Sequence, residues 1–270
     1  MTRLRQRTDV LRGLARLGYG ARGMVYLVVG ALAVLDAVGA AGQESVDSKG
    51  ALETILGQPF GKVLLGLVAL GLVGHALWRL IQAGADADNH GTDFKGLTVR
   101  GGLLVSAITH AALAFFAVSL IFGLGTGGGN GAEDWTAKLL GQSFGRWLVI
   151  VVGVVVIGAG CAHIYKGATA GFERYLTLDE EHMRWARPLC QFGLIARGVV
   201  FGIIGTFFII AAWHFNSGEA KGLKGALDTL EAQAYGPILL GVVALGLAAF
   251  GVYSLIEATH RRIQAPDLSM

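Results

Sequence analysis

The sequence is poor in cysteine, proline and charged residues, and these shortages exclude several classes of protein. Its 270 residues include only 2 cysteines, Cys161 and Cys190, so neither a disulfide framework nor a cysteine metal cluster is expected. Only 4 residues are proline and 15% are charged, whereas 53% are hydrophobic and 42 residues are glycine. This composition is too apolar for a soluble domain and indicates a membrane protein.

The sequence also lacks a catalytic dyad, a cluster of metal-ligand residues and a nucleotide-binding motif. A glycine-rich stretch at 125–131 is not followed by the Lys-Ser/Thr pair of a phosphate-binding loop, so we interpret it as a flexible connection. We therefore predict a protein that is not an enzyme and that has no cofactor and no metal. The net charge of +3 predicts no nucleic-acid partner, because basic residues in a membrane protein report its topology.

Six apolar runs are each close to the roughly 20 residues that span about 30 Å of hydrocarbon as a helix. They cover approximately residues 20–41, 60–83, 99–124, 144–168, 193–216 and 236–260. The sequence therefore predicts an all-α polytopic membrane protein with six transmembrane helices.

The chain contains three copies of one two-helix unit. Copies one and three align without a gap at an offset of 175 residues, which places Arg22 on Arg197. The middle copy is aligned at an offset of 78 at Arg100 and of 84 further on, and the difference is assigned to the glycine-rich stretch. Three units of like orientation permit a pseudo-threefold arrangement about an axis along the membrane normal. The predicted divisions are a basic segment 1–16, hairpins 17–92, 93–178 and 179–262, and a tail 263–270.

The distribution of lysine and arginine predicts the orientation in the membrane. Sixteen of the 22 basic residues lie on the side of the N-terminus and six lie on the other side. Because basic residues accumulate in cytoplasmic segments, both termini are predicted to be cytoplasmic, and anionic lipid headgroups are predicted partners of the basic segment. Between the two spans of copies one and three, leucines at helical spacing predict a short interfacial helix, with an irregular loop as the alternative.

Two short motifs recur in all three copies. Each copy opens with an Arg-Gly dipeptide, at Arg22, Arg100 and Arg197, and each carries Gln-x-Phe/Tyr-Gly before its second span. This pattern resembles a bacterial family of six-span membrane proteins with three tandem two-helix repeats, known as domain of unknown function 1206. The resemblance extends from about Leu17 to Arg262. It implies a six-span protein of the bacterial inner membrane, and it implies no activity.

The three repeated arginines are the first candidate site. On one interpretation Arg22, Arg100 and Arg197 extend to the lipid headgroups and anchor the helices, which costs little at a helix end. On the other they converge on the cytoplasmic side as a ring that binds an anion or a phospholipid by bidentate hydrogen bonds. The glycine that follows each arginine would allow the close helix approach that such a ring requires.

His75 and His110 are the second candidate site, because both lie well inside predicted spans. Two imidazoles at similar depth could be axial ligands of a haem or part of a proton relay. The favoured interpretation is a hydrogen bond between helices, since neither histidine recurs in the other copies.

These patterns favour a non-catalytic inner-membrane protein, either an accessory or scaffold subunit of a larger membrane assembly or a lipid-binding protein. The alternative is a small conduit for ions or solutes along the pseudo-threefold axis, which the scarcity of polar residues in the spans disfavours. A haem-binding electron-transfer protein is a third and weaker alternative.

Overall fold

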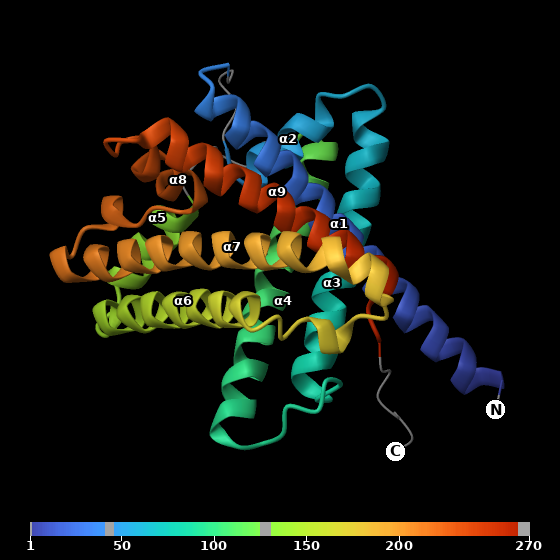
Figure 1. Ribbon diagram of the computed structural model, residues 1–270. Coiled ribbons are helices and arrows are strands. Elements are labelled where there is room, and N and C mark those ends of the chain that lie inside the picture. Colours follow the sequence, from blue (N-terminus) through green and yellow to red (C-terminus); the bar gives the residue numbers. More distant parts are fainter. Residues whose placement is uncertain (1, 41–45, 125–130, 264–270) are drawn as a thin grey trace.

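The computed structural model describes residues 2–40, 46–124 and 131–263, so most of the glycine-rich stretch and of the predicted tail lies outside the described residues. In the described part, six helices are long and apolar enough to cross a membrane (Figure 1). The fold is therefore the all-α polytopic membrane protein that the composition predicts. The six long helices are α1 (Thr2–Ala37), α3 (Gly61–Gly84), α4 (Phe94–Ile121), α6 (Gly145–Ala168), α7 (Glu180–His214) and α9 (Gly236–His260).

A short helix joins the two spans of every copy. These helices are α2 (Ser48–Leu56), α5 (Gly131–Leu140) and α8 (Leu223–Glu231), and two 3-10 turns, η1 (Glu173–Tyr175) and η2 (Ser217–Glu219), lie in the neighbouring links. The sequence predicts α2 and α8, whereas α5 is an addition in the middle copy. The carboxylate of Asp47 caps α2 by accepting from the N–H groups of Lys49 and Gly50.

The three short helices lie at one end of the long helices, and the start of α1 and the end of α9 lie at the other end (Figure 1). We call the first end the short-helix face. The second end, which also carries the links between α3 and α4 and between α6 and α7, is the terminal face. At the terminal face the link after η1 is tied to the end of α9, because Thr177 donates its N–H to the carbonyl of His260.

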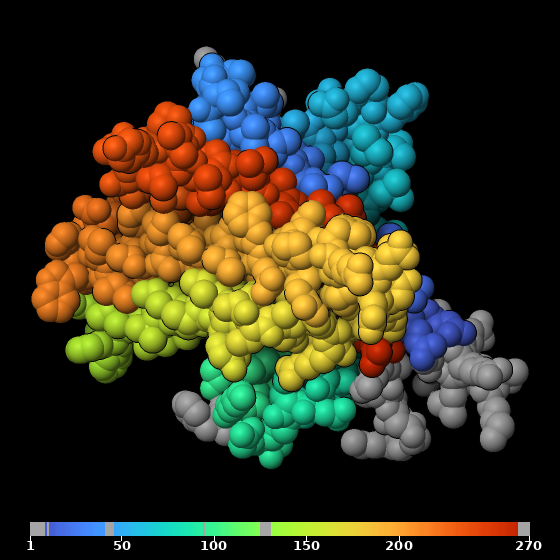
Figure 2. Space-filling view, viewed as in Figure 1, coloured from blue at the N-terminus to red at the C-terminus, as the bar shows by residue number. Residues whose placement is uncertain are grey.

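The long helices associate between copies more than within them. Helix α1 packs along α9, α3 along α4, and α6 along α7, and each of these pairs joins the first span of one copy to the second span of another. Figure 2 shows α9, α7 and α6 side by side across one face of the molecule. Helix α3 also packs on α1, and α9 on α7, but the described parts of α4 and α6 do not pack along each other. The middle copy therefore differs from the other two, and the pseudo-threefold arrangement stays a prediction.

Glycines permit the closest of these helix contacts. A Cβ atom added at Gly23 of α1 would lie 2.9 Å from the carbonyl oxygen of Gly251 in α9. A Cβ atom added at Gly198 of α7 would lie 2.6 Å from the carbonyl oxygen of Gly160 in α6. Small residues at such crossings let helix backbones approach in a membrane, where the hydrophobic effect gives no preference for helix association. The glycines after Arg22 and Arg197 thus serve helix packing, as the sequence predicts.

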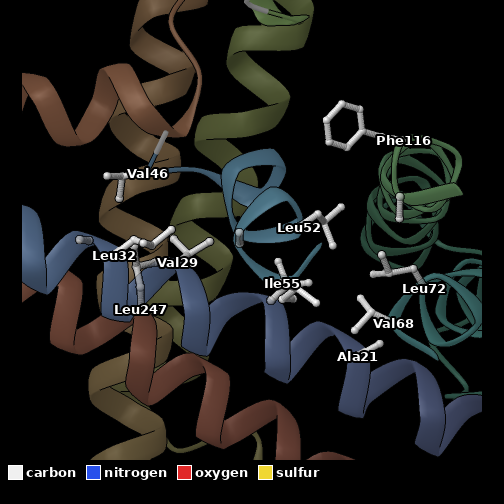
Figure 3. Close-up of a cluster of buried hydrophobic side chains, with 14 of the residues drawn as sticks. Ala21, Val29, Leu32, Val46, Leu52, Ile55, Val68, Leu72, Phe116 and Leu247 are labelled. Carbon is white, nitrogen blue, oxygen red and sulfur yellow. The ribbon is translucent and has the colours of Figure 1, made fainter. Parts of the chain in front are cut away.

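Helix α2 is held against the long helices by a buried apolar cluster (Figure 3). Leu52 and Ile55 of α2 lie among Val29 of α1 and Val68 and Leu72 of α3. Leu52 is completely buried, as is Leu227 at the same position of copy three. The cluster therefore fixes the short-helix face over the space between the spans.

Candidate functional site

Arg22 is buried in α1 and is neutralised by α9. Its Nη2 donates to Oε2 of Glu257 at 2.5 Å, and its Nε donates to the hydroxyl oxygen of Ser254 at 3.1 Å. Both partners are themselves buried. The guanidinium therefore points along the helix pair into the protein and is not extended to the headgroups.

Glu257 is the centre of a buried polar network near the terminal face. Its second carboxylate oxygen accepts from Arg261, so one carboxylate serves Arg261 and Arg22 together. Arg261 also donates to Asp88 at 3.1 Å, and Asp88 accepts from the side-chain amide of Gln82 at 2.6 Å. Because these residues come from α1, α9, α3 and the α3–α4 link, the network ties separate copies of the repeat together.

Arg197 is also buried but has no such partner. It lies at the midpoint of α7, and only 8% of its surface is exposed. Its guanidinium carbon lies 4.3 Å from the ring centre of Phe250, 4.8 Å from that of Phe201 and 4.9 Å from that of Tyr26. In the described part of the chain it forms no hydrogen bond or ion pair, and its Nε is buried without a partner. Three aromatic faces attract this charge, but no carboxylate among the described residues pairs with it.

Arg100 lies elsewhere. It is half-buried near the start of α4, and it donates to the carbonyl oxygens of Ala83 at 2.7 Å and Gly84 at 3.1 Å, at the end of α3. A cation at a helix C-terminus satisfies carbonyls that lack a partner within the helix and interacts favourably with the helix dipole. The structure therefore brings two of the three predicted arginines together and gives Arg100 a capping role at the terminal face.

Arg22 and Arg197 line the same cavity, which we call the arginine cavity. Its volume is about 200 Å³, and α1, α4 and α7 provide most of its wall. Apart from the two arginines, its polar side chains in the spans are Tyr26, Thr109 and His110. Leu223 and Ser48 of the short helices close it toward the short-helix face. The cavity thus lies between the helices of the bundle, and its wall is mostly apolar but includes the two arginine side chains.

The two predicted histidines are in direct contact. The ring centres of His75 and His110 lie 4.4 Å apart, so a porphyrin plane has no room between them, and the pair does not fit the two axial ligands of one haem. Nδ1 of His110 lies 2.7 Å from the carbonyl oxygen of Ser106, to which it donates. Nε2 of His75 accepts from Arg79 at 3.2 Å. In the described residues there is no group of three or more metal-ligand side chains.

A second cavity opens at the terminal face and has a volume of about 430 Å³. Asp88, which belongs to the Glu257 network, lines it together with Tyr175 and Arg262. In the same α3–α4 link, the N–H groups of Gly91 and His90 donate to the carboxylate of Asp86 and hold its pKa below the ordinary value. These bonds shape the link that carries Asp88.

The six apolar helices, the buried charges and the cavity between the spans define a polytopic membrane protein. The chain belongs to the family described as Domain of Unknown Function (DUF1206), whose model matches it three times in tandem, at residues 17–86, 101–170 and 192–261. It is 32% identical over 267 residues to the uncharacterized protein YxxB of Bacillus subtilis (strain 168), which covers 97% of this chain and 96% of that protein. No solved structure matches the chain.

The three matches correct the alignment of the middle copy. Counted from the first residue of each match, the position of Arg22 and Arg197 falls on Ser106, not on Arg100. The packing agrees, because a Cβ atom at Gly101 would meet nothing within 4 Å, whereas Ala107, in the position of Gly23, is buried. Arg100 bonds the end of α3 and does not line the arginine cavity, so the described structure does not bring the three arginines into one ring. In the middle copy, the position of Arg22 and Arg197 is occupied by Ser106.

The same counting explains why Arg197 is unpaired. The position of Glu257 in copy three is occupied by Lys166 in copy two, and the position of Ser254 by His163. Helix α6 packs on α7, which carries Arg197. Where α9 places the carboxylate of Glu257 and the hydroxyl of Ser254 beside Arg22, α6 therefore carries the ammonium of Lys166 and the imidazole of His163. His163 uses its Nδ1 for a bond within its own helix. Among the described residues, α6 therefore has no carboxylate at the position from which α9 neutralises Arg22.

Sequence reasoning missed Glu257, Ser254 and Asp88. A signal for the first was present, because a glutamate three residues before the end of an apolar span is costly and requires a cationic partner. The identity of that partner depends on the pairing of α1 with α9, which the repeat pattern alone does not give.

Proposed function

We propose that this protein is a non-catalytic integral membrane protein that binds a phosphate group in the arginine cavity, with Arg197 as the principal ligand and Arg22 beside it. The phosphate is that of a lipid headgroup or is free phosphate. In this proposal the terminal face is cytoplasmic, and the protein serves in the bacterial inner membrane as a lipid-binding or accessory subunit.

The observation that carries the proposal is the buried, unpaired guanidinium of Arg197 at the wall of a cavity. An uncompensated charge inside a membrane protein is expensive and by default marks a functional site. The three aromatic contacts offset part of this cost but give no hydrogen-bond acceptor. Phosphate supplies the negative charge and the paired oxygens that a guanidinium fork binds.

The local charge balance supports the same conclusion. In the described part of the chain, Arg22, Arg197 and Arg261 are buried, and the carboxylates bonded to this group are those of Glu257 and Asp88. Glu257 and Asp88 neutralise Arg22 and Arg261. Of these three buried arginines, Arg197 is the one that bonds neither carboxylate, and it lies at the cavity wall.

Arg197→Gln is expected to weaken phosphate binding about tenfold or more, because it removes at least one charge-assisted hydrogen bond of about 1.5–3 kcal/mol. The measurement is a calorimetric titration of delipidated protein in a maltoside detergent, once with inorganic phosphate and once with dioctanoyl phosphatidic acid. Binding of the lipid alone identifies a headgroup site, and binding of both identifies a site for phosphate in general.

Arg100→Gln is the matched control, since Arg100 stands in the same Arg-Gly motif but caps α3. It should leave both titrations unchanged. Arg197→Gln should also leave the folded protein intact, because no pair is broken. Equal affinity of wild type and Arg197→Gln, or no binding to wild type, would contradict the proposal. Phosphate flux into liposomes that requires Arg197 would instead identify the conduit.

A further inference from the structure

The arginine cavity is not closed on all sides. Its lining residues Val25 on α1, Leu72 on α3 and Leu247 on α9 are buried, and Tyr26 on α1 is half-buried. On α4, by contrast, Thr109 lines the cavity and is exposed, and Phe201 on α7 is only half-buried. The open edge of the cavity therefore runs between α4 and α7.

This edge lies where the helix packing is incomplete. The spans of copy one pack on each other, as do those of copy three, but the described parts of α4 and α6 in copy two do not. Helices α4 and α6 are also the least covered spans, with 33% and 17% of their most apolar segments buried. Thr109 lies near the middle of α4, so the opening faces the hydrocarbon region of a bilayer and not the water at either face.

The wall of the opening is apolar. On the two helices beside the opening, Leu113 and Ile204 line the cavity together with Phe201, and the hydroxyl of Thr109 donates to the carbonyl of Val105 within its own helix. A volume of about 200 Å³ is below the roughly 300–1,000 Å³ of sites that enclose a drug-sized molecule. The cavity can accordingly enclose a headgroup but not a whole lipid, and a chain attached to that headgroup would leave through the opening.

We propose that the ligand is a phosphate-bearing amphiphile that enters the arginine cavity sideways from the bilayer, between α4 and α7. Its phosphate binds Arg197, and its hydrocarbon chain stays in the opening beside Thr109 and Phe201. This inference rests on the proposed function and adds the ligand class and the route. It distinguishes the site from one for a soluble anion, which would have to enter from water past the short helices.

The test compares three probes on the full chain in maltoside micelles: hexadecyl phosphate, methyl phosphate, and hexadecanol as the uncharged chain. Wild type is expected to bind hexadecyl phosphate at least tenfold more tightly than methyl phosphate, and hexadecanol should give no saturable binding. Thr109→Trp, which places a large apolar side chain in the opening, should weaken hexadecyl phosphate binding at least tenfold and leave methyl phosphate binding unchanged.

The control is Ile108→Trp, since Ile108 is the adjacent exposed residue of α4 but does not line the cavity. It should bind all probes like wild type. Thr109→Phe, a smaller plug, gives a second variant, and an unchanged unfolding temperature and elution volume show that each variant is folded. Binding of methyl phosphate as tight as that of hexadecyl phosphate, or no effect of either plug, would overturn the sideways route and leave the proposed function standing. Failure of wild type to bind either phosphate would overturn both.

Discussion

Replacing Glu257 by glutamine is expected to lower the free energy of unfolding by about 3–5 kcal/mol, the range found when one partner of a buried ion pair is removed. Glutamine has nearly the same size, so no cavity arises, but the negative charge between Arg22 and Arg261 is lost. Both guanidinium groups bond this one carboxylate, and both are buried. The substitution therefore leaves a second uncompensated cation near the arginine cavity.

The measurement is reversible unfolding in mixed micelles, followed by circular dichroism. Asp228→Asn is the control, because its ion pair with Lys224 is exposed, and it should cost less than about 1 kcal/mol. The double variant Arg22→Gln with Glu257→Gln should be less destabilised than the sum of the two single variants, since the residues are in contact. A stability of Glu257→Gln within 1 kcal/mol of wild type would show that the pair does not hold α1 to α9.

Much of the fold can be predicted from the sequence, because its determinants are local. The apolar runs give the six spans, and the leucines at helical spacing give α2 and α8. The gapless match of copies one and three places Arg22 and Arg197 at the same position of their helices, and the structure then shows both at one cavity.

The alignment error at Arg100 has a physical cause. A match of three residues is a weak guide to the alignment of the copies. A stronger guide is the requirement that a small residue face the neighbouring helix at each close crossing. Gly23 meets that requirement against Gly251, and in the middle copy Ala107 stands at the same position, while Gly101 faces open space. A test for small residues on both sides of each helix contact would have selected the offset of 84 throughout.

The buried network could not be predicted for a different reason. It depends on which span lies beside which, and the chain pairs each first span with the second span of another copy. Glu257 also has no carboxylate counterpart, since Gln82 and Lys166 occupy its position in the other copies. The repeat pattern therefore draws attention away from the residues where the copies differ, and these residues determine which arginine is neutralised.

The glycine that ends the recurring Gln-x-Phe/Tyr-Gly motif has a steric role, and its replacement is the second change with a large expected effect. A Cβ atom at Gly61 would lie 1.9 Å from the carbonyl oxygen of Leu56, the last residue of α2. The corresponding distances are 1.7 Å at Gly145 and 1.6 Å at Gly236, so each copy starts its second span against the end of its short helix. Alanine at Gly61 cannot fit without a backbone shift.

Gly61→Ala is therefore expected to destabilise the protein by about 3 kcal/mol, at the upper end of the usual cost of overpacking. The matched control is Gly57→Ala, four residues earlier and immediately before the motif. There the nearest atom to an added Cβ lies at 3.5 Å, and copy three already carries Ala232 at this position. Gly57→Ala should be neutral or slightly stabilising. Unfolding curves of the two variants in the same micelles decide the matter, since equal stabilities would mean that the glycine is not required by the turn into α3.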